Sequence, residues 1–132
     1  MILSWMAWMQ HIKKGEIYLA NLGNIKKEDI GKIRPVLIFQ NNLLNRMLSE
    51  TTFNDVIVIP LSSQIVKNDF SYIINKRDRL QKDSTILCNA IKMINAKRLK
   101  TDKGYLTKLN KNEIKNIENI LYKLFDCNIT HL

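Results

Sequence analysis

An arginine and a serine stand where two apolar runs of this chain meet polar sequence. Arg34 lies just before Pro35 and the apolar run 36–39, and Ser62 follows the apolar run 55–61. Runs of this length, rich in β-branched residues, are typical of buried strands. A guanidinium fixed at the rim of a rigid strand is well suited to hold a phosphate or a carboxylate.

These two side chains meet part of what metal-free RNA cleavage requires. The reaction needs an activated ribose 2′-hydroxyl, stabilisation of a dianionic phosphorane and protonation of the leaving 5′-oxygen. A fixed arginine supplies charge and can donate protons, and a neighbouring hydroxyl can hydrogen-bond the phosphoryl oxygens. The spacing leaves a second interpretation open, in which Arg34 is an ordinary surface charge and Ser62 caps a turn.

Several other chemistries lack suitable residues. Both histidines, His11 and His131, lie in terminal segments, so a mechanism with a histidine base has no well-placed group. Cysteines, histidines and carboxylates show no metal-ligand spacing, and glycine-rich phosphate loops are absent, so we expect neither a metal nor another cofactor. Cys88 and Cys127 are expected to be free thiols. A β-barrel module that only binds is also compatible with these observations.

The charge balance favours a polyanionic partner. Lysine and arginine number 21 against 12 acidic residues, which gives a net charge of +9. Nucleic acid, an acidic protein or an anionic membrane surface would suit this charge, although a lysine-rich surface also simply keeps a protein soluble. A chain of 132 residues is expected to form one domain with a core of its own.

The N-terminal residues 1–12 form an apolar extension that holds both tryptophans and has the spacing of a short helix. The extension lacks the basic start and cleavage site of a signal peptide, and no apolar run is long enough to cross a membrane, so we expect a cytoplasmic protein. Translation from Met9 is an alternative explanation of the extension. Residues 13–126 then form the single domain, and 127–132 form a tail.

Alternating and apolar runs predict strands through the middle of the chain. The expected strands are 16–22, 36–39, 55–61, 70–75, 84–94 and 104–108, with single helical turns at 43–48 and 95–99. The first two strands are expected to form an antiparallel pair joined by a mobile, lysine-bearing loop over 23–32. Residues 76–82 are expected to form a charged loop.

The clearest single element is a helix that starts after Asn110. Asn110 is a preferred N-cap, Glu113 completes a capping box, and Leu109 can pack against Ile114. Apolar residues then recur at helical spacing to Phe125 and predict an amphipathic helix of about four turns. Several strands and one terminal helix, without βαβ alternation, indicate an α+β fold built on a small β-barrel.

The same motifs, in the same order, carry a resemblance to a known family. They are GEIYLANL at 15–22, GKIRPVLI at 31–38 followed by QN at 40–41, VIVIPLSSQI at 56–65, DSTIL at 83–87, and residues 94–99. Through these motifs the chain resembles the MazF/PemK (Kid-like) toxins of type II toxin–antitoxin systems. The glycine and Arg-Pro-Val of the second motif, after a GEIY-like strand, are the most specific part.

The resemblance implies an SH3-like barrel of the CcdB/PemK type that forms a homodimer. It also implies an mRNA interferase: a metal-independent, sequence-specific endoribonuclease that leaves a 2′,3′-cyclic phosphate and a 5′-hydroxyl on single-stranded RNA and so inhibits translation and growth. The family's catalytic arginine falls on Arg34 and its catalytic threonine or serine on Ser62. Positions implied to contact RNA are Lys32, Ser63, Gln64, Asn89 and Lys92, although Lys92 fits a solvated strand lysine equally well.

The sequence departs from the family pattern at Asn89 and Ala90. Relatives often carry an acidic residue and then a glutamine there, and the carboxylate is proposed to act in acid–base chemistry in some of them. Asn89 cannot perform that role, so either Arg34 and Ser62 suffice or the activity is lower. The loop before the Arg-Pro motif also lacks the family's glutamine, because Asp29 is followed by Ile30.

A basic toxin of this family would bind an acidic antitoxin, and DNA only indirectly through that antitoxin. We expect the antitoxin to cover the groove near Arg34. RNA bases would stack on Tyr18 or Phe70 if these rings are exposed, but strand aromatics more often belong to the core. Two other functions stay open: a CcdB-like toxin that poisons gyrase, and a catalytically inactive module that binds RNA or an antitoxin.

Overall fold

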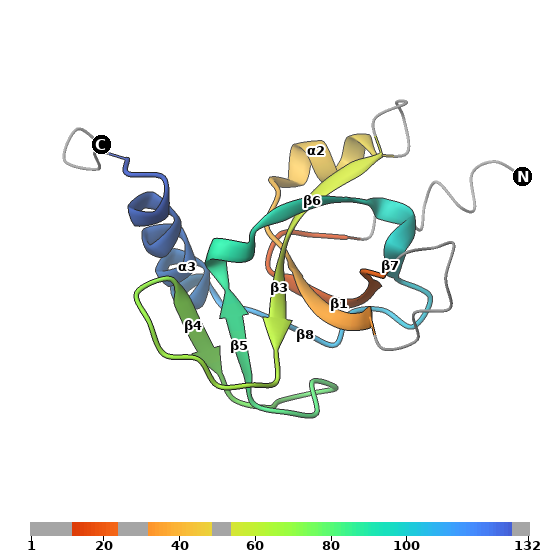
Figure 1. Ribbon diagram of the computed structural model, residues 1–132. Coiled ribbons are helices and arrows are strands. Elements are labelled where there is room, and N and C mark those ends of the chain that lie inside the picture. Colours follow the sequence, from red (N-terminus) through yellow and green to blue (C-terminus); the bar gives the residue numbers. More distant parts are fainter. Residues whose placement is uncertain (1–11, 24–31, 49–53, 128–132) are drawn as a thin grey trace, which may run out of the picture.

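The computed structural model describes residues 12–23, 32–48 and 54–127. In this part of the chain an antiparallel sheet of eight strands curls into a half-barrel, and one long helix follows it at the C-terminal end (Figure 1). The predicted α+β fold, a small barrel with a C-terminal helix, is therefore confirmed.

The strands lie close to the predicted positions. They are β1 (Glu16–Asn21), β2 (Ile33–Ile38), β3 (Asp55–Ser62), β4 (Ser71–Ile74), β5 (Ser84–Leu87), β6 (Lys92–Asn95), β7 (Leu99–Lys100) and β8 (Thr107–Lys108). Their order in the sheet is β4-β5-β3-β2-β1-β7, with β6 paired to β3 and β8 paired to β1. The expected antiparallel pair of β1 and β2 is present, and residues 24–31 of the loop predicted between them lie outside the described residues.

The helical segments also follow the sequence. Single turns were expected at 43–48 and 95–99, where the structure has α2 (Asn42–Met47) and the 3-10 turn η3 (Ala96–Arg98). The long helix α3 (Lys111–Leu124) begins with the predicted capping box. The amide N–H of Glu113 donates to Asn110 Oδ1 at 2.8 Å, and the amide N–H of Asn110 donates to Glu113 Oε1 at 2.9 Å.

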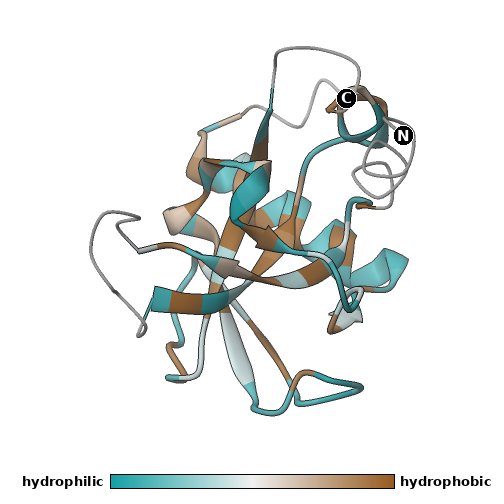
Figure 2. Cartoon of the chain, turned by 90° about the vertical axis from the view of Figure 1, so that its right-hand side faces the viewer, coloured by the Kyte–Doolittle hydropathy of each residue, from teal (hydrophilic) through white to brown (hydrophobic). Residues whose placement is uncertain are grey.

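Both faces of the central strands are buried. Tyr18, Ala20 and Val36 belong to one hydrophobic cluster, whereas their neighbours Ile17 and Leu37 belong to a second cluster, against which α3 packs. This is why β1 to β3 are apolar almost without interruption rather than alternating with polar residues (Figure 2). Ile12 is buried in the first cluster, and the rest of the expected helical extension lies outside the described residues.

The prediction of one long strand over 84–94 was wrong. The 3-10 turn η2 (Cys88–Ala90) separates β5 from β6. Leu61 pairs with Ile86 and Val58 pairs with Lys92, so β3 advances three residues while its partner segment advances six. The three-residue turn η2 takes up the difference where the sheet bends. The strand expected over 104–108 is likewise reduced to β8, because Gly104 lies in a turn at a φ of 78°.

Candidate functional site

The ends of β2 and β3 bring Arg34 and Ser62 to the same level of the sheet. Val36 lies opposite Pro60 in the antiparallel register. This is the last pair of the two strands, and Arg34 and Ser62 each lie two residues beyond it on their own strand. Opposed residues of an antiparallel pair project to the same face, so both side chains leave the sheet on the face that Val36 occupies. The two residues predicted to be catalytic are thus neighbours at one rim of the half-barrel.

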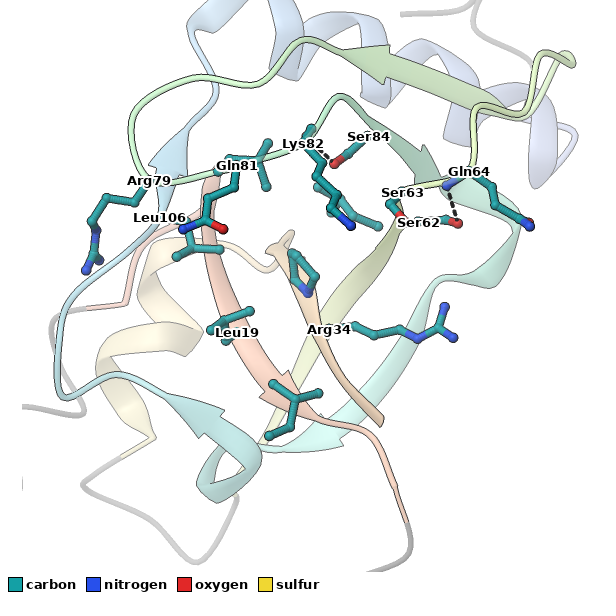
Figure 3. Close-up of a pocket in the computed structure, with 14 residues that line it drawn as sticks. Leu19, Arg34, Ser62, Ser63, Gln64, Arg79, Gln81, Lys82, Ser84 and Leu106 are labelled. Atoms are coloured by element: carbon teal, nitrogen blue, oxygen red, sulfur yellow. Dashed lines mark hydrogen bonds between the residues drawn. The ribbon is translucent and has the colours of Figure 1, made fainter. Parts of the chain in front are cut away.

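A cavity of about 690 Å³ opens at this rim (Figure 3). One wall comes from β2, from β3 and from the turn after β3, and it includes four of the predicted site residues. A second wall comes from the segment between β4 and β5. The lining residues are Leu19, Ile33, Arg34, Pro35, Leu61, Ser62, Ser63, Gln64, Arg79, Leu80, Gln81, Lys82, Ser84 and Leu106. Three of these side chains are basic and none is acidic, so the cavity favours an anionic ligand.

Arg34 is exposed at the second position of β2 and makes no hydrogen bond or ion pair with any residue that the structure describes. Its strand holds it firmly nonetheless: Ala20 lies opposite Arg34, and Leu19 lies opposite Pro35. Pairing of β2 to β3 begins only at Val36, which leaves the N–H-less proline in a part of the strand with a partner on one side. No described residue uses the donors of this guanidinium, so they can address a ligand.

The hydrogen bonding of Ser62 is compatible with both interpretations of this residue, as a cap of a turn and as a hydroxyl that contacts a ligand. Its Oγ accepts a hydrogen bond of 3.1 Å from the amide N–H of Gln64, which shapes the turn after β3. The hydroxyl proton is not used in that bond and is free to point to a ligand. Ser63 and Gln64 are exposed beside Ser62 on the cavity wall (Figure 3).

Thr85 holds the turn after β3 through two hydrogen bonds, a role that the sequence did not indicate. Its buried hydroxyl donates to the carbonyl of Gln64 at 2.8 Å and accepts from the amide of Val66 at 3.0 Å. Thr85 also pairs with Ser62 across β3 and β5. The strand position of Thr85 is visible in the sequence, but its contact with a turn about twenty residues away is a tertiary feature.

Three of the predicted RNA-contacting residues do not line the cavity. Lys32 is exposed before β2, Asn89 is exposed in η2, and Lys92 is exposed on β6. Lys92 lies opposite Val58, a member of the same cluster as Val36, so it projects from the sheet face that carries Arg34 and Ser62. Lys92 therefore belongs to the surface around the rim, although it lies outside the cavity.

The aromatic residues considered for base stacking are not free platforms. Tyr18 is buried, and its hydroxyl donates to Glu16 Oε1 at 3.0 Å. Burial, together with the Glu16 carboxylate, raises the pKa of Tyr18 well above its ordinary value. Phe70 is half-buried in the turn before β4. The core interpretation therefore holds for Tyr18.

Three further findings on the described residues concern metal sites, cysteine thiols and membrane-spanning helices. They contain no group of three or more histidine, cysteine or carboxylate side chains placed to hold a metal ion. Cys88 is buried and Cys127 is exposed, and both are free thiols. No helix in the described ranges has the length and apolar character needed to span a membrane.

Solved structures share this fold. An endoribonuclease from a mycobacterial species, in complex with its cognate antitoxin, superposes with a TM-score of 0.68 at 19% identity, covering 89% of this chain and 97% of that one. The Mycobacterium tuberculosis toxin MazF-mt6 gives 0.67 at 18% identity, with 86% and 98% covered. A MazE–MazF complex from Deinococcus radiodurans gives 0.66 at 12% identity, with 89% and 97% covered. The half-barrel with its C-terminal helix is thus the fold of the MazF toxins.

The sequence itself identifies the family. Residues 13–125 match the family of PemK-like, MazF-like toxins of type II toxin–antitoxin systems. The match includes the Arg34-Pro35 motif, the Ser62 turn and α3. This chain therefore belongs to the PemK/MazF-like toxin family, as its resemblance indicated.

Proposed function

We propose that this toxin is an endoribonuclease that cleaves single-stranded RNA without a metal ion, with Arg34 and Ser62 as catalytic residues. The observation that carries the proposal is that the ends of β2 and β3 bring both residues to one rim of the half-barrel, in the lining of a cavity whose described side chains include three basic and no acidic ones. An activity of this kind fits the family, and the mycobacterial protein whose structure superposes on this chain is described as an endoribonuclease.

The proposed reaction is a transfer within the RNA backbone. The ribose 2′-oxygen attacks phosphorus and loses its proton to water, and the bond from phosphorus to the 5′-oxygen breaks. Charge builds on the non-bridging oxygens, where the Arg34 guanidinium and the Ser62 hydroxyl stabilise it. Arg34 donates a proton to the leaving 5′-oxygen and is reprotonated by water, which returns the proton taken from the 2′-hydroxyl. The products are a 2′,3′-cyclic phosphate and a 5′-hydroxyl, and cleavage of mRNA would stop translation.

The basic rim also suits a protein partner. We include in the proposal that an acidic antitoxin segment covers the cavity at Arg34, because neutralising this guanidinium blocks RNA most directly. MazF from Deinococcus radiodurans was solved with MazE, and the mycobacterial endoribonuclease with its antitoxin. A homodimer in the cytoplasm, and DNA contact only through the antitoxin, complete the proposed biology.

The test is cleavage of a long single-stranded transcript by the purified protein in EDTA, followed by mapping of the ends. The proposal expects cuts at defined sequences that persist in EDTA, carry cyclic phosphate and 5′-hydroxyl ends, and disappear in Arg34→Ala. An intact transcript would overturn it. Gyrase inhibition alongside an intact transcript would instead support a CcdB-like toxin.

One observation favours a second candidate, a catalytically inactive binding module. Asn89, in η2, provides an amide at the position where relatives often carry a carboxylate that is proposed to act in acid–base chemistry. Such a module would bind RNA with the salt dependence of a basic protein but leave it uncut. Binding without cleavage in the same assay distinguishes it from the endoribonuclease.

A further inference from the structure

The cavity has a second basic wall, which comes from the segment that the sequence predicted only as a charged loop. Between β4 and β5 the chain folds back through the bridge that pairs Arg77 with Leu80. The residues after this bridge, among them Gln81 and Lys82, line the cavity opposite β2 (Figure 3).

The turn is held rigidly by its neighbours. The Arg77 guanidinium donates to both Glu113 carboxylate oxygens, at 2.8 and 2.9 Å, and to the carbonyl of Lys108 at 2.9 Å. Thr107 Oγ1 donates to the Asp78 carboxylate at 2.6 Å. The amide of Arg79 donates to the carbonyl of Leu106 at 3.0 Å. A turn tied to β8 and to α3 in this way presents its side chains in fixed positions.

The acidic residues close to Lys82 in sequence, Asp78 and Asp83, form no ion pair with it. The Asp78 carboxylate accepts from Thr107, and the Asp83 carboxylate accepts from the amide of Lys76 at 2.8 Å. The backbone of Lys82 is fixed through its carbonyl, which accepts from the buried Ser84 hydroxyl at 2.8 Å. Its ammonium group makes no hydrogen bond or ion pair with any described residue.

Arg79 differs from Lys82 in this respect. Its guanidinium donates to the carbonyl of Tyr105, so part of its capacity serves to hold the turn. In Figure 3 the Lys82 side chain extends from the turn towards the strand ends, whereas Arg34 extends from β2 in a different direction. The two cationic side chains therefore point to separate positions.

We propose that Lys82 binds a second backbone phosphate of the RNA, separate from the phosphate that Arg34 holds for cleavage. The inference rests on the proposed function for the identity of the ligand. Lys82 is a binding residue that fixes the register of the strand across the cavity, and the rigid turn of residues 77–80 is the platform that positions it. A lysine acts here as a point charge, which suits a phosphate that is held but not transformed.

Binding and cleavage are measured separately, so that the two proposals can fail independently. Binding uses a randomised single-stranded pool with 2′-O-methyl riboses, which cannot cleave because the nucleophile is blocked. Lys82→Ala is expected to weaken binding about threefold to tenfold and to reduce the slope of log affinity against log salt by about 0.7, the loss of one single-strand phosphate contact. Lys82→Arg is expected to restore both values.

The matched control is Lys76→Ala, which removes an equal charge from an exposed lysine of the same segment outside the cavity. If Lys82→Ala and Lys76→Ala change the affinity and the salt slope equally, the inference is overturned, and melting curves establish that both variants are folded. Lys82→Gln provides a second neutral variant with a long side chain. Cleavage by the wild type together with identical binding of both variants overturns the Lys82 inference alone. The opposite outcome is a wild-type protein that does not cleave RNA, together with a loss of affinity and of salt slope in Lys82→Ala but not in Lys76→Ala. That outcome overturns the proposed function alone.

Cleavage kinetics provide a further readout. A residue that binds a phosphate equally in the ground and transition states changes KM and leaves kcat unchanged. Lys82→Ala is therefore expected to raise KM about threefold to tenfold at an unchanged kcat. A fall in kcat with an unchanged KM would overturn the assignment of Lys82 as a binding residue.

Discussion

The Arg77 guanidinium and the Glu113 carboxylate form a two-bond ion pair, at 2.8 and 2.9 Å, that joins the turn after β4 to the first turn of α3. The Glu113 side chain is only 13% exposed. Its hydrogen bonds to Arg77 lower the pKa of Glu113, the Asn110 amide acts in the same direction, and desolvation opposes them. One carboxylate thus caps a helix and anchors the wall of the candidate site.

Replacing Glu113 with Gln tests the charge of this pair while keeping a side chain that can close the capping box. We expect the free energy of unfolding to fall by about 1–2 kcal/mol at neutral pH. Because the pKa is depressed in the folded state, the contribution is present above the unfolded-state pKa of about 4.3 and is lost as the pH falls through the lower folded-state value. Urea unfolding at a series of pH values measures this.

The control for that variant is Glu118→Gln, which removes the more exposed Lys14–Glu118 pair. Its cost is expected to stay below about 1 kcal/mol. A Glu113→Gln difference that stays constant down to acidic pH would contradict the role assigned to the charge.

Gly15 and Gly104 offer a matched pair for separating backbone strain from crowding. Both adopt a positive φ, of 95° and 78°. A Cβ on Gly15 would lie 2.9 Å from Ile114 Cδ1, whereas a Cβ on Gly104 would meet nothing nearer than Arg79 Nη2 at 3.8 Å. We expect Gly104→Ala to cost about 1 kcal/mol of unfolding free energy and Gly15→Ala about 1–2 kcal/mol, since only the latter also forces the end of the Ile114 side chain to move. Equal costs in urea unfolding would show that crowding against α3 contributes nothing.

The sequence predicted most elements of the fold because their signals are local. The apolar run 55–61 and the capping box of Asn110 and Glu113 depend on neighbours within a few residues, and both are present. The break at η2 could not be predicted in the same way. Alternation continues through Cys88, and the turn exists because β3 pairs with β5 at one end and with β6 at the other.

The residues of the candidate site can be divided in the same way, into those with a local signal in the sequence and those without one. Arg34 and Ser62 could be singled out because each lies beside a strand end that the sequence marks, whereas Ser63 and Gln64 were implied only by the family resemblance. The position of Lys82 at the cavity depends on tertiary contacts of its segment, among them the bond of Arg77 to Glu113, 36 residues further on. The buried amide of Asn45 is a similar case: it donates to the carbonyl of Gln40 at 3.0 Å and accepts from the Gln40 side chain at 3.2 Å. Nothing in the local sequence distinguishes Asn45 from exposed asparagines nearby.

Asn89 is the position where the sequence raised a doubt about catalysis, and its place in the structure predicts a small effect. It is exposed in η2 and does not line the cavity with Arg34 and Ser62. We therefore expect Asn89→Asp to change the cleavage rate by less than about threefold and to add no new ionisation to the pH–rate profile, since catalytic acids and bases must reach the reacting atoms. A tenfold faster variant with a new acidic limb would contradict this.

Arg34 provides the sharpest test of the proposed chemistry, because charge and geometry can be separated there. Arg34→Ala is expected to lower the single-turnover cleavage rate by on the order of 10²–10³, the usual loss when one donor to a developing oxyanion is removed. Arg34→Lys keeps the charge but loses the planar fork that addresses two phosphoryl oxygens, so it should recover only a small part of the rate.

Binding of 2′-O-methyl RNA should fall less than about tenfold in both Arg34 variants, because one phosphate contact is affected. Arg46→Ala, which removes an exposed arginine of α2 outside the cavity, is the control and should cleave at the wild-type rate. A wild-type rate for Arg34→Lys would mean that charge alone suffices, and a wild-type rate for Arg34→Ala would remove Arg34 from the reaction.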